Sequence, residues 1–261
     1  MGAKKMESNI DVIAIIPARY QSNRFEGKPL ADICGKPMIQ HVVERARKVK
    51  IVSRVVVATD DIRIGTCVES FGGEYVLTRN DHVSGTDRLA EAAEKIGISE
   101  HDVVVNIQGD QPLFPGEVID QVARPLLEDP ALPMSTLMYK IIRKEEICDP
   151  NHVKTVFDRD NYALYFSRSP IPFQRNPEDG ATPTYYKHLG FYAYRKGFLL
   201  SFVALPEGEW ERFEKLEQLR ALEYGYRIKV ILTEHDSIEV DTPEDLLRVE
   251  AFLKAQKNIS R

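Results

Sequence analysis

The chain reads VIAII at residues 12–16 and continues without a break into PARYQSNRFEGKPL at residues 17–30. The first segment is a continuous apolar run with the length of a buried β-strand. The second carries three cations, Arg19, Arg24 and Lys28, on a path shaped by one glycine and two prolines. Ligands bind an open α/β sheet beyond the carboxyl ends of its strands, so we expect these cations to meet a polyphosphate there. A solvated basic turn is the alternative.

Apolar, β-branched runs alternate with helical patterns through the first half of the chain. The spacing predicts strands at residues 12–16, 54–58, 74–77 and 103–107, and helices at 36–49, 62–71, 84–96 and 115–127. Such alternation is typical of an α/β fold, with a doubly wound, mainly parallel sheet and helices on both faces.

The spacing becomes less regular after residue 130. We expect strands at 135–139, 153–157, 163–166, 189–194 and 228–232, a loop at 174–184, and helices at 211–224 and 243–254. Residues 10–261 then form a single domain, in which approximately residues 130–210 make a smaller mixed α+β subdomain inserted in the middle third. That subdomain is a candidate lid or dimer surface.

Composition excludes several classes of protein. The 261 residues carry a net charge of −5, which argues against general nucleic-acid binding. The three cysteines form no metal-ligand spacing, as expected for a reduced cytosolic protein. No apolar run approaches the roughly 20 residues of a membrane span, and the start lacks the apolar core of a secretion signal. We therefore expect a cytoplasmic protein with neither a nucleic-acid nor a membrane partner.

Two acids follow predicted strands. Asp110 ends the segment VVVNIQGD and should project at the same edge as the basic loop. A carboxylate there suits Mg²⁺, which proteins hold through one or two carboxylates plus phosphate and water; a turn or helix-cap role is the alternative. Near the carboxyl end, Thr242, Pro243 and Asp245 read as a helix start. That reading leaves Asp241 available as a second Mg²⁺ ligand.

Further polar groups precede or follow the predicted strands. Residues 84–88 read SGTDR, a capping box at a helix start, and helix N-termini also bind anions. The Gln108 amide both donates and accepts hydrogen bonds, so it could read a base. Asp60 and Asp61 are expected to cap a helix and are left outside the metal site.

Five motifs occur in one collinear order: PARYQSNRFEGKPL, SGTDRLAE, QGDQP, YFSRSPIP and KLEQLR. From about residue 13 to residue 252, the chain resembles the sugar cytidylyltransferases, above all the CMP-Kdo synthetases (3-deoxy-manno-octulosonate cytidylyltransferases). The resemblance implies a nucleotide-diphospho-sugar transferase-like fold and a homodimer. It also implies an enzyme that joins CTP to the acidic keto sugar Kdo and releases pyrophosphate, for lipopolysaccharide biosynthesis.

The resemblance assigns roles by position. Asp110 and Asp241 are implied as the Mg²⁺ ligands and, with Arg19 and Lys28, as the catalytic residues. The implied CTP contacts are Ala18, Arg19, Arg24, Lys28, Ser84, Gly85, Thr86, Arg88 and Gln108. The implied sugar contacts are Arg168, His188, Tyr192, Glu217 and Gln218. An arginine fork suits a sugar carboxylate, and strand alternation puts His188 and Tyr192 on one face.

The chain departs from the family pattern at a few positions. Gln111 stands where the family usually has Glu, Lys187 replaces an Arg, and Lys215 stands where Ser is frequent. The departures at Gln111 and Lys215 leave the exact sugar open, and alternatives of other classes remain as well. The alternatives are a cytidylyltransferase for 8-amino-Kdo, sialic acid or pseudaminic acid, a metal-dependent glycosyltransferase, and a non-catalytic regulator that binds CTP or sugar.

Overall fold

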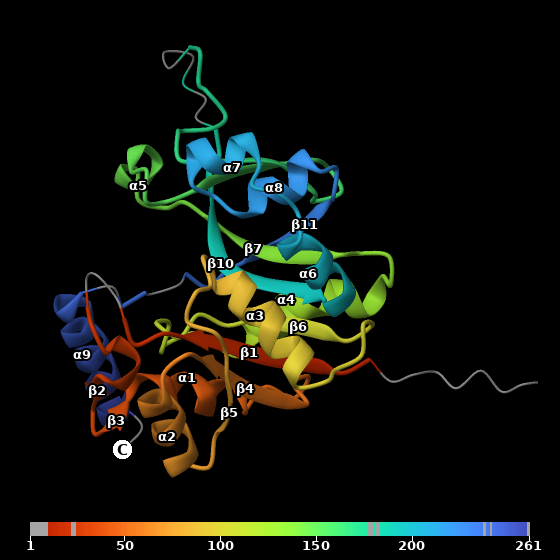
Figure 1. The fold of residues 1–261 in the computed structure, drawn as a ribbon. Helices are drawn as coiled ribbons and strands as arrows, with labels where there is room; N and C mark the ends of the chain where they lie inside the picture. Colours follow the sequence, from red (N-terminus) through yellow and green to blue (C-terminus); the bar gives the residue numbers. More distant parts are fainter. Residues whose placement is uncertain are drawn as a thin grey trace, which may run out of the picture.

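The computed structural model describes residues 10–21, 25–176, 180, 183–236, 239–240 and 242–259. Its centre is a twisted sheet with the strand order β11-β7-β10-β6-β1-β4-β5 (Figure 1). The strands are β1 Val12–Ala18, β4 Arg54–Thr59, β5 Glu74–Leu77, β6 Val103–Asn106, β7 Met134–Lys140, β10 Tyr186–Arg195 and β11 Ile228–Thr233.

Most neighbouring strands run in the same direction. β1 pairs in parallel with β4 and β6, β4 with β5, and β7 with β11, whereas β10 is antiparallel to β6 and β7, its two neighbours in this order. This arrangement confirms the predicted α/β class with a mainly parallel sheet. Parallel strands covered on both faces read as continuous apolar runs, which is why residues 12–16 contain no polar residue.

Helices cover the sheet on two sides. They are α1 Met38–Ala46, α2 Ile62–Ser70, α3 Gly85–Lys95, α4 Glu117–Glu128 and α6 Lys196–Val203. Buried residues of α1, α2 and α4 pack with Ala14 and Ile16 of β1 in one core. Those of α3 and α6 pack with Ile13 and Ile15 in the other. The alternating side chains of one strand therefore hold both layers together.

The predicted helix starts at Ser84 and Asp61 are confirmed. The Ser84 hydroxyl accepts from the Asp87 backbone N–H at 3.1 Å, while Asp87 accepts from the Ser84 backbone N–H at 3.0 Å. Asp61 accepts from the backbone N–H of Arg63 at 2.8 Å and caps α2. The expected capping role of Asp60 is wrong, because its carboxylate accepts from the Arg88 guanidinium at 2.8 Å instead.

The single helix predicted at residues 211–224 is wrong. The segment forms two short helices, α7 Glu209–Glu214 and α8 Gln218–Glu223. Lys215 between them has φ 53°, a left-handed conformation that no helix can continue through. The turn lets Leu216 enter the core and brings Glu217 to the start of α3. The helix predicted from residue 36 also begins later, because β3 Lys36–Pro37 pairs with β2 Asp32–Ile33.

Residues 130–210 contribute to two parts of the molecule. Their strands β7 and β10 belong to the central sheet, whereas β8 Lys154–Phe157 and β9 Ala163–Ser167 form a hairpin joined to it through β10. With α5 Glu145–Cys148, α7 and α8, this hairpin occupies the upper part of Figure 1. The boundaries of a subdomain remain a prediction.

The carboxyl-terminal segment packs beside the basic loop. Helix α9 Pro243–Ile259 lies against β2 and β3 (Figure 1), and Val249 shares a small core with Ile33 and Met38. The Thr242 hydroxyl and the Asp245 carboxylate form the predicted helix start, with the Asp245 backbone N–H donating to Thr242 Oγ1 at 3.3 Å. Among the helices described by the structure, none is long and apolar enough to cross a membrane.

Candidate active site

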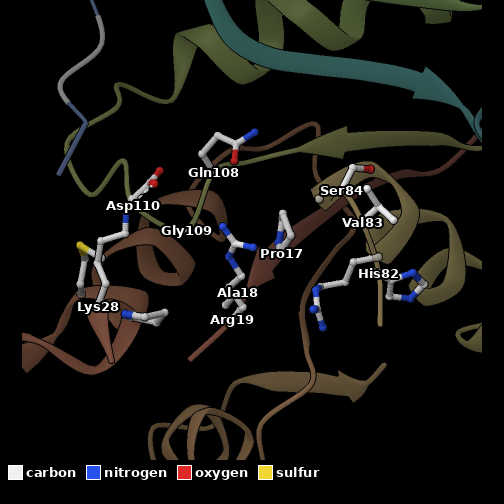
Figure 2. Close-up of a pocket in the computed structure, with 14 residues that line it drawn as sticks. Pro17, Ala18, Arg19, Lys28, His82, Val83, Ser84, Gln108, Gly109 and Asp110 are labelled. Carbon is white, nitrogen blue, oxygen red and sulfur yellow. Dashed lines mark hydrogen bonds and ion pairs between the residues drawn. The ribbon is translucent and has the colours of Figure 1, made fainter. Parts of the chain in front are cut away.

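A cavity of about 290 Å³ opens at the carboxyl ends of β1 and β6 (Figure 2). It is lined by Pro17, Ala18, Arg19, Lys28, Pro29, Met38, His82, Val83, Ser84, Gly85, Arg88, Gln108, Gly109 and Asp110. Seven residues predicted to contact CTP therefore share one pocket with the predicted metal acid Asp110. Parallel strands place these groups together, because their carboxyl ends meet at one edge of the sheet.

Arg19 enters this pocket from the end of β1. Its side chain is exposed, and its guanidinium has no hydrogen-bond or ion-pair partner in the described part of the chain. A guanidinium presents five N–H donors that match phosphate oxygens. Arg19 can therefore receive an anion without first breaking an internal contact. Arg24 of the same loop lies outside the described residues.

Lys28 reaches the pocket from the short 3-10 helix η1, Lys28–Leu30. Its Nζ donates to Asp110 Oδ2 at 2.7 Å, with the Lys28 side chain 14% exposed and that of Asp110 28% exposed. The predicted phosphate cation and the predicted metal acid are thus joined directly. Gly27 supports this position, because its φ of 69° is left-handed and its N–H donates to the Tyr20 carbonyl at 2.9 Å.

The backbone around Asp110 is fixed on both sides. A Cβ at Gly109 would lie 3.0 Å from the Pro17 carbonyl oxygen, so a glycine allows the close approach to β1. On the other side, the Val240 backbone N–H donates to the Asp110 carbonyl at 2.9 Å. Val240 directly precedes Asp241 in the chain, but Asp241 itself lies outside the described residues.

Gln111 has an identifiable partner at this edge. Its side chain is 1% exposed, and its Nε2 donates to Glu239 Oε1 at 2.9 Å. A glutamate at position 111, the usual residue of the resembling family, would instead face the Glu239 carboxylate with a like charge. The amide therefore suits this chain's own surroundings.

The SGTDR segment divides between the pocket and the protein interior. Ser84, Gly85 and Arg88 line the cavity. The Arg88 guanidinium is already occupied, because it donates to Asp60 Oδ2 at 2.8 Å and to Thr78 Oγ1 at 2.5 Å. Thr86 does not line the cavity, and its hydroxyl donates to the Glu217 carboxylate. The predicted CTP contacts of Arg88 and Thr86 remain predictions, and the structure gives each side chain an internal partner.

Gln108 connects the pocket to β10. Its Nε2 donates to the Gly190 carbonyl at 3.4 Å. Gly190 lies between His188 and Tyr192 in sequence, and a Cβ added to it would meet no heavy atom within 4 Å among the described residues. Gly190 therefore leaves open space at this point of β10, between the two predicted sugar residues in sequence.

His188 and Tyr192 face the same side of the sheet, as predicted. Their ring centroids are 5.2 Å apart, and the His188 ring also lies 5.2 Å from Phe166. Burial lowers the pKa of His188 to about 3 and raises the pKa of Tyr192 well above its ordinary value. Both side chains are therefore neutral at pH 7 and offer hydrogen bonds without charge.

The start of α8 supplies two more predicted sugar residues. Desolvation raises the pKa of Glu217, while hydrogen bonds from Thr86 and Ser84 oppose that shift. Gln218 is 6% exposed, and its Nε2 has no hydrogen-bond partner among the described residues. A buried amide without a partner is costly, so a polar ligand group is a reasonable occupant of the space beside it.

Arg168 is the predicted sugar residue with the most internal contacts. Its guanidinium donates to three backbone carbonyls, those of Glu214 at 2.7 Å, Pro150 at 2.9 Å and Lys215 at 3.3 Å. The Glu214 carboxylate in turn accepts from the Arg168 backbone N–H at 2.9 Å. This arginine therefore ties the end of β9 to the end of α7. Its sugar contact remains a prediction.

The pocket also contains residues that the sequence reasoning did not identify. They are Pro17, Pro29, Met38, His82, Val83 and Gly109. His82 donates a hydrogen bond from Nε2 to the Glu91 carboxylate, and its side chain is 5% exposed. Its position two residues before Ser84 was the available signal. Met38 had no comparable signal, because it looks like an ordinary first residue of an amphipathic helix.

A mainly parallel sheet with a lysine–carboxylate pair and an arginine that has no partner among the described residues in one pocket is the arrangement expected of an α/β protein that binds a phosphorylated ligand. Comparison with known proteins agrees. The family model described as cytidylyltransferase matches residues 13–230. The chain belongs to the cytidylyltransferase family.

Individual relatives cover almost the whole chain. A 3-deoxy-manno-octulosonate cytidylyltransferase of Syntrophus aciditrophicus is 59% identical over 93% of this chain and 97% of that protein. An 8-amino-3,8-dideoxy-manno-octulosonate cytidylyltransferase of Shewanella baltica is 54% identical over 94% and 99%. A solved CMP:2-keto-3-deoxy-manno-octonic acid synthetase complexed with CTP superposes with a TM-score of 0.88 at 44% identity, covering 94% of this chain and 99% of that one. These findings confirm the predicted family and fold.

Proposed function

We propose that this chain joins CTP to 3-deoxy-D-manno-octulosonate (Kdo), giving CMP-Kdo and pyrophosphate for lipopolysaccharide biosynthesis. The observation that carries the proposal is the convergence of Arg19, which has no partner among the described residues, and the Lys28–Asp110 pair on one pocket at the strand ends. Relatives that are 52–59% identical carry names for this activity or for its 8-amino-sugar counterpart, which supports it.

The reaction is an in-line substitution at phosphorus. The anomeric hydroxyl oxygen of the sugar forms a bond to the α-phosphorus of CTP and gives its proton to water. The bond from that phosphorus to the oxygen bridging to the β-phosphate breaks, and pyrophosphate leaves. Arg19 and Lys28 neutralise the triphosphate and the departing pyrophosphate. Catalysis of this kind depends on positioning and on charge stabilisation in the transition state.

The donor chemistry fits Mg²⁺. Asp110 offers a carboxylate at the pocket edge, and Mg²⁺ prefers a few carboxylates complemented by phosphate oxygens and water. We assign Asp110 and Asp241 as its ligands; the backbone N–H that donates to the Asp110 carbonyl belongs to Val240, the residue before Asp241 in the chain. When bound, the ion would supply charge neutralisation at the phosphates and lower the pKa of the sugar hydroxyl.

The sugar is assigned to the side of the pocket that faces β10 and α8. His188 and Tyr192 present neutral polar groups there, and the Gln218 amide has an unused donor within the described residues. These groups suit the hydroxyls of a polyol. Two hydrogen bonds connect this side of the pocket to the nucleotide side. Gln108 donates to the Gly190 carbonyl, and Thr86 donates to the Glu217 carboxylate.

We further propose a cytoplasmic homodimer. Large apolar side chains are exposed on β9, on the segment that follows it and on α7, namely Leu164 at 60%, Phe173 at 83% and Phe213 at 75%. Exposed apolar surface of this kind marks protein contacts. Sedimentation of the purified chain would report the dimer mass, and a monomer at micromolar concentration would contradict this assignment.

The activity is tested by mixing the protein with CTP, Mg²⁺ and either Kdo or its 8-amino analogue and following pyrophosphate. We expect a higher kcat/KM with Kdo. A higher kcat/KM with the amino sugar would transfer the assignment to that substrate. No pyrophosphate release with either sugar would contradict the proposed reaction. Asp110→Asn should lose about 100-fold or more in turnover while circular dichroism shows the same fold. A near-normal rate would overturn the metal role of Asp110.

A further inference from the structure

The 2.7 Å contact between Lys28 Nζ and Asp110 Oδ2 joins two groups that the reaction needs for different partners. Lys28 has to reach phosphate oxygens, and Asp110 has to reach a divalent cation. In the structure these two groups contact each other. We propose that Lys28 is an internal counter-cation for the Asp110 carboxylate. Lys28 leaves Asp110 available to a divalent cation only when nucleotide phosphates bind the Lys28 ammonium group. This inference rests on the proposed function.

The geometry allows this exchange without a change of fold. The Lys28 backbone is held by Gly27 and by the turn of η1, where the Ala31 N–H donates to the Lys28 carbonyl at 3.1 Å. The Asp110 backbone is held by Val240 and Gly109. Only the four-carbon stem of Lys28 has to rotate, and lysine is a flexible chain with a compact charge at its end.

Electrostatics determines the direction of the exchange. A divalent cation at the Asp110 carboxylate would lie near the Lys28 ammonium group and be repelled by it. The pair is largely shielded from water, since the two side chains are 14% and 28% exposed, so solvent screens this repulsion only in part. While Lys28 contacts Asp110, the site therefore disfavours a divalent cation at that carboxylate. A triphosphate reverses this balance, because it brings oxygens that bind both the ammonium group and the metal.

In this order of binding, Arg19 makes the first contact with the nucleotide. It lines the same pocket and has no internal partner among the described residues, so its guanidinium can bind phosphate while Lys28 still holds Asp110. Lys28 then transfers to phosphate, and the carboxylate becomes available. Metal and nucleotide affinity are coupled by this step, and such coupling is reciprocal.

Direct measurement of Mn²⁺ binding to the nucleotide-free protein tests the proposal. Mn²⁺ is titrated against wild type, Lys28→Gln, Lys28→Arg and the double variant Lys28→Gln/Asp110→Asn, with free ion followed by electron paramagnetic resonance. We expect Lys28→Gln to bind one Mn²⁺ at least about tenfold more tightly than wild type. Lys28→Arg should stay weak because it keeps the charge, and the double variant should lose the gain.

Three results would overturn the inference. Equal affinity in wild type and Lys28→Gln, with both folded by circular dichroism, would show that Lys28 does not restrain the acid. A gain that persists in the double variant would place the ion elsewhere. A gain shared by Lys28→Arg would exclude charge as the cause. None of these measurements uses turnover, so the proposed reaction stands or fails separately in the pyrophosphate assay.

Discussion

Thr86 donates its hydroxyl to the carboxylate of Glu217, and this bond joins the start of α3 to the start of α8. The two residues lie 131 positions apart in the sequence. Thr86 belongs to the segment that lines the nucleotide pocket with Ser84 and Gly85, whereas Glu217 lies on the side assigned to the sugar. This hydrogen bond therefore connects the side of the site assigned to the nucleotide with the side assigned to the sugar.

Thr86→Val should weaken this link. Valine has nearly the shape of threonine but no hydroxyl, so the largely desolvated Glu217 carboxylate loses a donor. We expect the free energy of unfolding to fall by about 1–2 kcal/mol and KM to rise for both substrates. Thr86→Ser keeps the hydroxyl and is the matched control. Urea unfolding and initial rates measure both effects, and equal behaviour of the two variants would contradict the role of the bond.

Arg19 and Arg88 line the same pocket but should respond oppositely to replacement. Arg19→Met removes a cation with no internal partner among the described residues, so we expect turnover to fall about 100-fold with the free energy of unfolding within about 0.5 kcal/mol of wild type. Arg88→Met leaves Asp60, whose side chain is 18% exposed, without its ion pair. Its unfolding free energy should fall by about 3 kcal/mol. Thermal unfolding and pyrophosphate release separate the two cases, and a reversed pattern would contradict the assignment.

Arg168→Lys tests what that guanidinium does. A lysine ammonium group cannot reproduce the three carbonyl contacts to Pro150, Glu214 and Lys215, so we expect a loss of about 1–3 kcal/mol in the free energy of unfolding. Arg175, an exposed arginine of the same region, gives the matched control Arg175→Lys, which should unfold like wild type. If Arg168→Lys kept full stability and only raised KM for the sugar, the sugar contact would be its main role.

The sequence was sufficient for the sheet and for one end of the pocket, for a physical reason. Buried parallel strands are continuous apolar runs, and the residues that directly follow them, such as Arg19 and Asp110, must lie at one edge. Local signals also identified the helix starts at Ser84 and Thr242. These features depend on neighbours within a few residues.

Contacts between distant segments were not predictable in the same way. Arg88 and Arg168 read as available cations, yet Asp60 in one case and three carbonyls in the other occupy them. The leucine spacing of residues 216–222 suited one continuous helix, and only tertiary packing explains why Lys215 interrupts it. Arg24 and Asp241 lie outside the described residues, so their roles stay predictions.

His188 should make the protein less stable in mild acid. Its Nε2 lies 2.9 Å from Thr136 Oγ1, and that hydroxyl donates its one proton to the Phe191 carbonyl at 2.7 Å. The neutral His188 ring must therefore carry its proton on Nε2 and donate it to Thr136.

The pH dependence follows from the difference between folded and unfolded states. Desolvation holds the pKa of His188 at about 3 in the folded chain, against an ordinary value of 6.5. Between these values the unfolded chain binds one more proton, so stability is complete above pH 6.5 and falls as the pH drops toward 3. Each pH unit costs about 1.4 kcal/mol, which gives about 2 kcal/mol at pH 5. His188→Gln has no titrating ring, so the difference in unfolding free energy between wild type and variant should shrink by this amount from pH 7 to pH 5. Parallel urea unfolding curves for the two proteins across that range would mean that the ring protonates as easily in the folded chain as in the unfolded one.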